Sequence, residues 1–291
     1  MTTENFRLEK VRDFGLLFSD TFLFIKYNFK NLLKGMLYYV VPFGLLQGVV
    51  MGLFQYETLL SLGNGSGINA NYSSSTVIYS TLASYIFMLI SYTVAIAFIT
   101  QYIKLYRDKG ANNFEVNEVG KAMLNNIPKI LGAIILSGII VVLGCILLII
   151  PGIYIGVCIS LVVPIIVFED ESVGNAISAC FNLIKSNWWN TFAVLFVIGL
   201  ISSALNFVFQ LPSTIYQLMS TIFMANGDAM TPSKSLLILF SIIQGIGYAL
   251  IQVLPLTAIV MQYFNLIERR QSPALLKDLE TVGNNETSIS K

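Results

Sequence analysis

Three carboxamide side chains inside long apolar stretches are the residues best placed to do chemistry at membrane depth. Gln244 and Gln252 are eight residues apart and would share one face of a helix, where Asn206 from another stretch could meet them. Such amides either hydrogen-bond one helix to another, which contributes about 0.6–2 kcal/mol, or line a polar path for a substrate. We favour the interhelical hydrogen bond and keep the polar path as the alternative.

The one acidic run, Glu169-Asp170-Glu171, could bind a metal ion or supply a base. It stands just before an amphipathic stretch, where carboxylates stabilise the positive N-terminus of a helix, so we interpret it as a helix cap. The cysteines, Cys145, Cys158 and Cys180, are odd in number and form no CxxC pair. This spacing argues against a zinc site and against a disulfide framework.

The complete lack of histidine removes several kinds of chemistry. Histidine-ligated metals, Ser-His-Asp triads, histidine bases and histidine proton relays all need it. The apolar stretches also hold no Asp, Glu, Lys or Arg, whereas transporters coupled to protons or cations usually carry such a buried charge. We therefore predict no catalytic residue, no metal and no cofactor, and expect that the protein is not an enzyme. The net charge of +1 indicates no nucleic-acid partner.

These residues are embedded in a chain with the composition of a membrane protein. Hydrophobic residues make up 55% of it and charged residues 11%, whereas a soluble domain carries about 25% charged residues. About 20 apolar residues in a helix cross a hydrocarbon layer of about 30 Å, and the uncharged stretches accommodate six such spans. They lie at about 35–55, 76–103, 129–150, 152–168, 188–210 and 235–267.

Prolines mark where spans end or bend. Pro151-Gly152 predicts a tight hairpin between the third and fourth spans, the fifth is expected to end near Pro212, and Pro255 should kink the sixth. The fold class we predict is all-α: a polytopic helical membrane protein of six transmembrane helices. Residues 1–270 would form a single transmembrane domain and residues 271–291 a flexible, polar cytoplasmic tail.

Basic residues set the predicted orientation. All but one of the 17 lysines and arginines fall before the first span, between the second and third, between the fourth and fifth, or after the sixth; the exception is Lys234. Cytoplasmic loops are enriched in Lys and Arg. An even number of spans therefore places both termini in the cytoplasm, with the protein in the inner (cytoplasmic) membrane.

An amphipathic stretch precedes each pair of spans, at about 14–29, 116–127 and 173–184, and each has apolar residues at helical spacing. Asn28, Asn126 and Asn187 each precede an apolar residue and the start of a span. This pattern predicts interfacial helices and a threefold internal repeat of interfacial helix, span out and span back. The simpler alternative is that any interfacial helix entering a membrane has such a boundary.

Glycines recur at helix-packing spacing in two spans. Gly44, Gly48 and Gly52 are four residues apart, as are Gly152 and Gly156. Small residues at this spacing let helix backbones approach closely. The face could join two copies of the chain, but we favour packing inside the bundle.

One segment resembles a known family. The matching features run from about 150 to 195 and comprise Pro151-Gly152-Ile153-Tyr154, Pro164, Glu169 to Glu171, Ser172, Ala176, Ser178, Lys185 and Trp188-Trp189. They resemble the membrane domain attached to some bacterial glycerophosphoryl diester phosphodiesterases, and its stand-alone relatives. The resemblance implies a helical inner-membrane bundle without catalytic residues. In the fused relatives a separate soluble domain with histidines does the chemistry, so we expect no diesterase activity here.

Three functions compete at this point. The first is a non-enzymatic scaffold or accessory factor for lipid or envelope processes, with membrane lipids and another membrane protein, or a second copy, as partners. The second is a transporter or lipid-translocating permease, since kinked helices in repeated units often surround a path. The third is an intramembrane enzyme, which would need a base that the apolar stretches do not offer.

Overall fold

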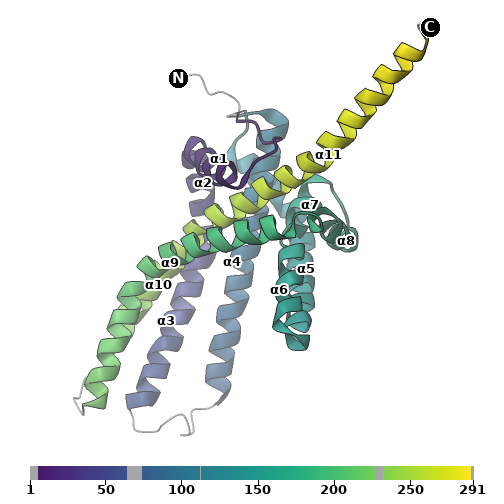
Figure 1. Ribbon diagram of the computed structural model, residues 1–291. Coiled ribbons are helices and arrows are strands. Elements are labelled where there is room, and N and C mark those ends of the chain that lie inside the picture. The colour runs from purple at the N-terminus through teal and green to yellow at the C-terminus, as the bar shows by residue number, and fades with distance from the viewer. Residues whose placement is uncertain (1–5, 64–73, 112, 227–231, 290–291) are drawn as a thin grey trace.

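The computed structural model describes residues 6–63, 74–111, 113–226 and 232–289, and the regular structure within them is helical throughout (Figure 1). Within these ranges, six helical segments are long and apolar enough to cross a membrane. They are Phe29–Leu60, Thr81–Lys109, Val116–Leu147, Ile149–Phe168, Trp188–Met224 and Lys234–Gln271. The predicted all-α, multi-pass membrane fold is confirmed.

The first part of the chain folds into a short helix followed by two long antiparallel helices. Helix α1 (Phe14–Tyr27) begins where the Asp13 side chain accepts the Leu16 backbone N–H, 2.7 Å away. The first span is α2 (Phe29–Gly35), a π-helical turn η1 (Met36–Val40) and α3 (Val41–Gly63), and α4 (Ser74–Lys109) returns. Between the first two predicted spans, residues 64–73 lie outside the described residues.

The remaining helices follow in the order α5 (Val116–Leu147), α6 (Ile149–Ile159), α7 (Val162–Phe168), α8 (Val173–Ile184), α9 (Trp188–Ala225), α10 (Lys234–Ile251) and α11 (Val253–Ile289). The prediction that the fifth span ends near Pro212 is wrong, because α9 continues through this proline to Ala225. A proline in a membrane helix costs one backbone hydrogen bond, which neighbouring groups can offset.

The predicted hairpin turn also lies a few residues earlier than expected. Leu148 alone is extended, with φ −160° and ψ 144°, and Pro151 falls in the first turn of α6. Proline is tolerated there because the N–H that it lacks would have no partner in that helix. The fourth span is broken between α6 and α7, at Ser160 and Leu161. Pro164 explains the break, since it cannot donate to the Ser160 carbonyl four residues earlier.

The sixth span breaks at Gln252, between α10 and α11. Pro255 cannot donate to the Ile251 carbonyl, and its ring crowds that carbonyl, so the kink predicted from Pro255 is present. The backbone from 271, predicted to be a polar tail, continues as helix to Ile289. That the tail is flexible stays a prediction.

The three amphipathic stretches fold in two ways. The first and third form separate helices, α1 and α8, whereas the second is the opening part of α5. Asn28 lies between α1 and α2 and Asn187 precedes α9, but Asn126 sits inside a continuous helix. The threefold repeat therefore stays a prediction.

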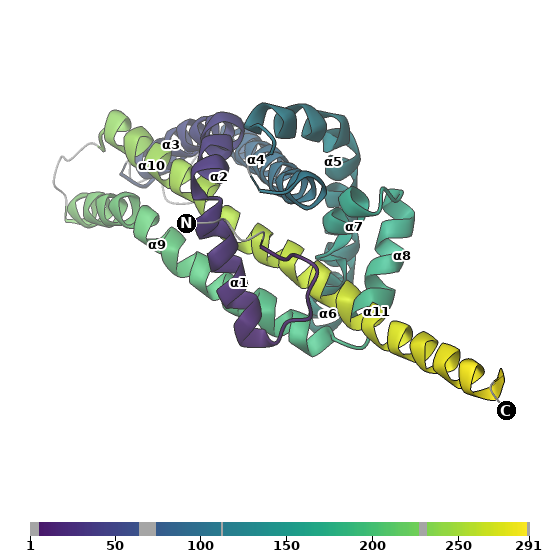
Figure 2. The same ribbon diagram turned by 90° about the horizontal axis from the view of Figure 1, so that it is seen from above.

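Most of the buried hydrophobic residues gather at one end, which we call the basic end because Arg7, Arg12, Arg107 and Arg269 lie there. Its buried layer, here the collar, is made by α1, α7, α8, the second half of α4 and the first half of α11. Figure 2, seen from this end, shows α1 lying across α11. At the opposite end, the far end, α3 finishes, α10 begins and much of α9 is exposed.

Candidate functional site: a polar groove between α3, α9 and α10

Helix α9 carries a stripe of polar side chains on one face. Ser203, Asn206, Gln210, Ser213 and Gln217 follow one another at intervals of three and four residues, which is the spacing of one helix face. Because α9 runs unbroken through Pro212, the stripe continues beyond the predicted end of the fifth span. The polar stripe is thus longer than the predicted fifth span could hold.

Helices α3 and α10 supply the facing side chains because their backbones touch. A Cβ atom added at Gly48 would lie 2.6 Å from the Ile242 Cα, and one added at Gly245 would lie 2.2 Å from the Gly44 carbonyl oxygen. Gly52 meets α10 in the same way, at 2.6 Å from the Ile238 Cα. The predicted glycine face of the first span therefore packs inside the bundle and brings α3 and α10 together.

Two cavities lie along the junction of these helices with α9. The first, of about 470 Å³, is lined by Gln47, Asn206 and Gln244, and the second, of about 580 Å³, by Gln55 and Gln217. Both are also lined by Met51, Gln210 and Gln244, so they adjoin. We call them together the amide groove, after its six carboxamide residues: Gln47, Gln55, Asn206, Gln210, Gln217 and Gln244.

A buried hydrogen-bonded node joins the three helices at the amide groove. The Gln55 Oε1 accepts hydrogen bonds from Ser213 Oγ, 3.2 Å away, and from Ser241 Oγ, 3.0 Å away. Gln217 Nε2 donates to Ser213 Oγ at 2.8 Å. Gln55, Ser213 and Ser241 are all buried. The bonds between them therefore form away from water and fix the position of α9 against α3 and α10.

Other amides of the groove keep free hydrogen-bonding capacity. Gln47 Oε1 is buried and has no hydrogen-bond partner among the described residues. Asn206 donates through Nδ2 to the Ser202 carbonyl at 2.9 Å, which leaves its Oδ1 as an acceptor. None of the described residues that line the groove is charged. Such a lining can donate to and accept from hydroxyl, ester and amide groups, but offers a cation no compensating charge.

The carboxamides predicted from the sequence fall into two groups. Asn206 and Gln244 both line the amide groove, whereas Gln252 lies at the break between α10 and α11 and lines neither cavity. Four carboxamides of the groove were not among the predicted residues: Gln47, Gln55, Gln210 and Gln217. The signal that could have found the last two is the polar spacing on α9, which continues past Pro212.

The second predicted glycine pair packs within the α5–α6 hairpin. A Cβ atom at Gly152 would lie 2.8 Å from the Cys145 Cα, so this glycine is needed for close contact. Gly156 has only an ordinary neighbour, Val141 Cγ1 at 3.9 Å from an added Cβ.

Each residue of the acidic run at the basic end contacts a different partner. Tyr263 donates its hydroxyl to Glu169 at 2.9 Å, Asp170 lies 3.6 Å from Lys129 Nζ, and Glu171 accepts the Asn175 side chain at 2.9 Å. The predicted carboxylate cap is wrong, because Ser172 is the N-cap of α8. Ser172 can take this role because its hydroxyl accepts the Asn175 N–H. Within the described residues no cluster of acidic or cysteine side chains could hold a metal ion.

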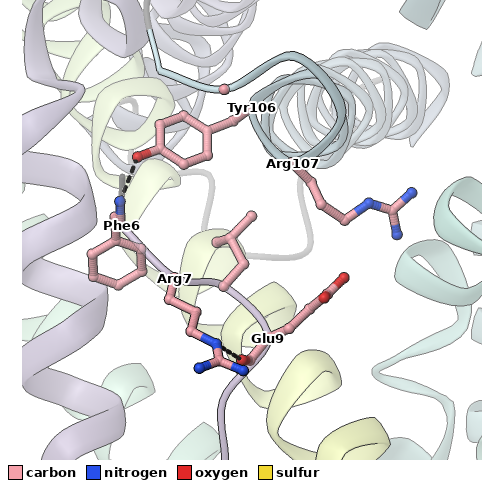
Figure 3. A pocket seen from close by; sticks show the side chains of 7 residues that line it. Phe6, Arg7, Glu9, Tyr106 and Arg107 are labelled. Atoms are coloured by element: carbon pink, nitrogen blue, oxygen red, sulfur yellow. Dashed lines mark hydrogen bonds between the residues drawn. The ribbon is translucent and has the colours of Figure 1, made fainter. Parts of the chain in front are cut away.

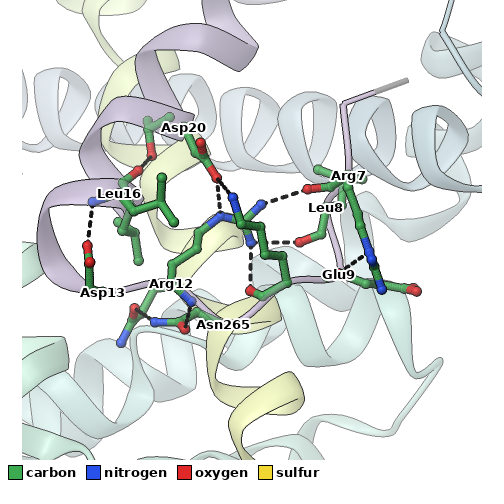
Figure 4. Close-up of polar contacts among 12 residues, drawn as sticks. Arg7, Leu8, Glu9, Arg12, Asp13, Leu16, Asp20 and Asn265 are labelled. Carbon is green, nitrogen blue, oxygen red and sulfur yellow. Dashed lines mark hydrogen bonds and ion pairs between the residues drawn. The ribbon is translucent and has the colours of Figure 1, made fainter. Parts of the chain in front are cut away.

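A buried arginine fastens the N-terminal segment to the collar (Figure 4). The Arg12 side chain is fully buried, pairs with Asp20 at 2.7 Å and donates to the backbone carbonyls of Arg7 and Leu8. Its backbone is bound as well, since the Arg12 N–H donates to Asn265 Oδ1 and Arg269 donates to the Arg12 carbonyl. These bonds tie residues 7–12 to α1 and α11.

A small cavity of about 190 Å³ lies beside this segment, between Phe6, Glu9, Tyr106 and Arg107 (Figure 3). Two hydrogen bonds already join polar groups of its lining. The Phe6 N–H donates to the Tyr106 hydroxyl, and Arg7 Nε donates to the Glu9 carbonyl. We therefore regard the amide groove, not this cavity, as the candidate site. Comparison of the chain with protein-family models, with curated proteins and with solved structures gives no match.

Proposed function

We propose that this chain is a non-enzymatic protein of the inner membrane that binds an amphiphile with an uncharged polar headgroup in the amide groove. It would serve as an accessory factor in a lipid or envelope process. The observation that carries the proposal is the groove itself: six carboxamides and several hydroxyls, without a charge, between helices that are otherwise apolar. Hydroxyls, esters and amides of a lipid headgroup match such a lining.

The position of the groove favours binding over passage. Its lining reaches Met88 on α4 and Tyr248 on α10. A few residues closer to the basic end, from Val94 on α4 and Leu254 on α11, the buried residues of the collar begin. In this conformation the collar therefore closes the groove toward the basic end, as expected for a site that takes an amphiphile from one leaflet.

Photocrosslinking tests the proposal. The purified chain is placed in vesicles of phosphatidylethanolamine and phosphatidylglycerol that contain a photoactivatable diacylglycerol. The double variant Asn206→Leu, Gln244→Leu should label at least about fivefold less than the unsubstituted chain, since each lost hydrogen bond weakens binding by about 1 kcal/mol. Gln101→Leu makes the same chemical change in a buried residue of α4 outside the groove and should label normally. Equal labelling of the groove variant and this control would contradict the proposal.

A lipid-translocating permease is the second candidate, and the break between α10 and α11 favours it. Tyr248 lines the amide groove and lies one turn before the break at Gln252, so a change of angle there would alter the groove. The test uses vesicles with fluorescent nitrobenzoxadiazole lipids and the impermeant reductant dithionite. A permease exposes both leaflets to reduction, whereas a binding protein leaves about half of the fluorescence, as in protein-free vesicles.

A further inference from the structure

The turn of the α5–α6 hairpin is the most apolar turn in the described part of the chain. Ile146, Leu147, Leu148, Ile149 and Ile150 are all aliphatic, and each is 68–80% exposed. In water, each of these side chains would forgo about 1.5–3 kcal/mol of burial. A turn that faced the aqueous phase would be expected to carry polar residues.

The hairpin is also shorter than its neighbours when measured from a common point. Lys104 Nζ donates to the Val167 carbonyl at 2.6 Å, so α4 and α7 are level there. From this contact α4 extends over 30 residues to Ser74, about 45 Å at 1.5 Å per residue. From Val167 back to Ile149 there are 18 residues, at most about 27 Å, and the break between α6 and α7 shortens this path. Figure 1 shows the turn ending before the far ends of α3, α4, α9 and α10.

The backbone of the turn is suited to a medium without water. Only Leu148 leaves the helical conformation. Its N–H donates to the Gly144 carbonyl and its carbonyl accepts the Gly152 N–H. Pro151 has no N–H that could be left unpaired in the first turn of α6. Because unpaired backbone groups cost several kcal/mol each in hydrocarbon, a turn of one residue followed by proline keeps that cost small.

The outward face of α5 that leads to the turn is apolar too. Ile135, Ile139, Val142 and Leu143 on α5 are between 45% and 57% exposed, while the inner faces of α5 and α6 pack on each other through Gly144 and Gly152. No described segment of the chain covers the turn. A layer of acyl chains is a partner that needs no complementary polar group, and the hairpin offers none.

We propose that α5 and α6 form a re-entrant hairpin, whose turn ends among lipid acyl chains instead of crossing to the far aqueous phase. Only α3, α4, α9 and the α10–α11 pair then cross completely. The number of complete crossings remains even, so the two ends of the chain stay on one side. Lipid therefore lies beyond the turn, in the leaflet nearer the far end.

Spin labelling tests the position of the turn in vesicles. Leu148→Cys is labelled in a chain with alanine in place of its three native cysteines, and Ser235→Cys, exposed at the start of α10, serves as the far-end control. Collisions with oxygen report hydrocarbon, and collisions with a water-soluble nickel chelate report water. We expect oxygen to dominate several-fold at position 148 and nickel to dominate at position 235.

Two results would overturn the proposal. Nickel access at position 148 equal to that at position 235 would place the turn in water, and low access to both reagents would mean that protein, not lipid, covers it. A label on the native Cys145, which is exposed near the turn, repeats the measurement without substituting Leu148. Because the amide groove lies on other helices, either failure leaves the proposed binding function standing.

Discussion

Single residues at the basic end show how this protein accommodates charge next to a membrane. Arg12 and Lys10 both lie near the Asp20 carboxylate, at 2.7 Å and 3.9 Å. They differ in burial, since the Arg12 side chain is 0% exposed and that of Lys10 is 44% exposed. Removing one partner of a buried ion pair leaves an uncompensated charge, whereas an exposed pair contributes little.

We therefore expect Arg12→Ala to lower the free energy of unfolding by about 3–5 kcal/mol and Lys10→Ala to change it by less than about 1 kcal/mol. Thermal unfolding of the detergent-solubilised protein measures both. Similar shifts for the two variants would show that burial does not distinguish them.

Cys180 gives a second prediction at this scale. It is buried in α8, and burial raises the pKa of its thiol to about 12. The thiolate is the reactive form, and the raised pKa keeps the thiol almost fully protonated at pH 8. Maleimide should thus leave Cys180 unmodified at pH 8 in the folded protein, while Cys145, which is exposed, reacts in detergent. Mass spectrometry of the peptides identifies the modified cysteine, and rapid labelling of Cys180 would contradict its burial.

Among the helices, glycine decides how closely two backbones can approach. An added Cβ meets backbone atoms at Gly48 but only a distant side chain at Gly156. Overpacking of this kind costs typically about 1–3 kcal/mol. Gly48→Ala should therefore destabilise the protein by about 2–3 kcal/mol, and Gly156→Ala should be nearly neutral.

Thermal unfolding compares the two alanine variants, and light scattering of the purified protein supplies a further check. If the glycines of α3 pack only on α10, Gly48→Ala changes stability but not oligomeric state. A loss of dimer in the variant would support the alternative that these glycines join two copies.

The prolines show how far sequence rules reach at the scale of elements. Pro212 and Pro255 each lack a backbone N–H donor, and the sequence predicted that the fifth span ends near Pro212 and that Pro255 kinks the sixth. Of these two spans, only the one with Pro255 is broken. Sequence rules account for the missing backbone donor but not for the packing of α9 against α3 and α10 around Ser213. Because the fifth span was predicted to end near Pro212, Gln217 was left out of the predicted polar cluster. Asn206 and Gln244, which the sequence suggested could meet, line the same cavity, whereas Gln55 could be found only once the glycine contact had positioned α3.

For the whole molecule, composition was sufficient to predict a helical membrane protein, and basic residues predict its orientation. Apart from Lys234, the lysines and arginines fall before the first span, between the second and third, between the fourth and fifth, or after the sixth. Both termini should thus face the cytoplasm. Epitope tags at the two ends should resist an impermeant biotin reagent on intact cells and react after permeabilisation. A cysteine in place of Ser235 serves as the positive control with an impermeant maleimide, and labelling of either tag from outside would contradict this topology.

The position of the collar has a mechanical consequence. Toward the far end α3, α9 and α10 are joined by the hydrogen bonds of Gln55, whereas the exposed turn of the α5–α6 hairpin is supported only from the collar, and the thermal displacement of such a projection grows with distance from its support. Pulsed electron resonance should give a narrow distance distribution between labels at Lys121→Cys and Lys185→Cys, and a broader one between labels at Leu148→Cys and Ser235→Cys.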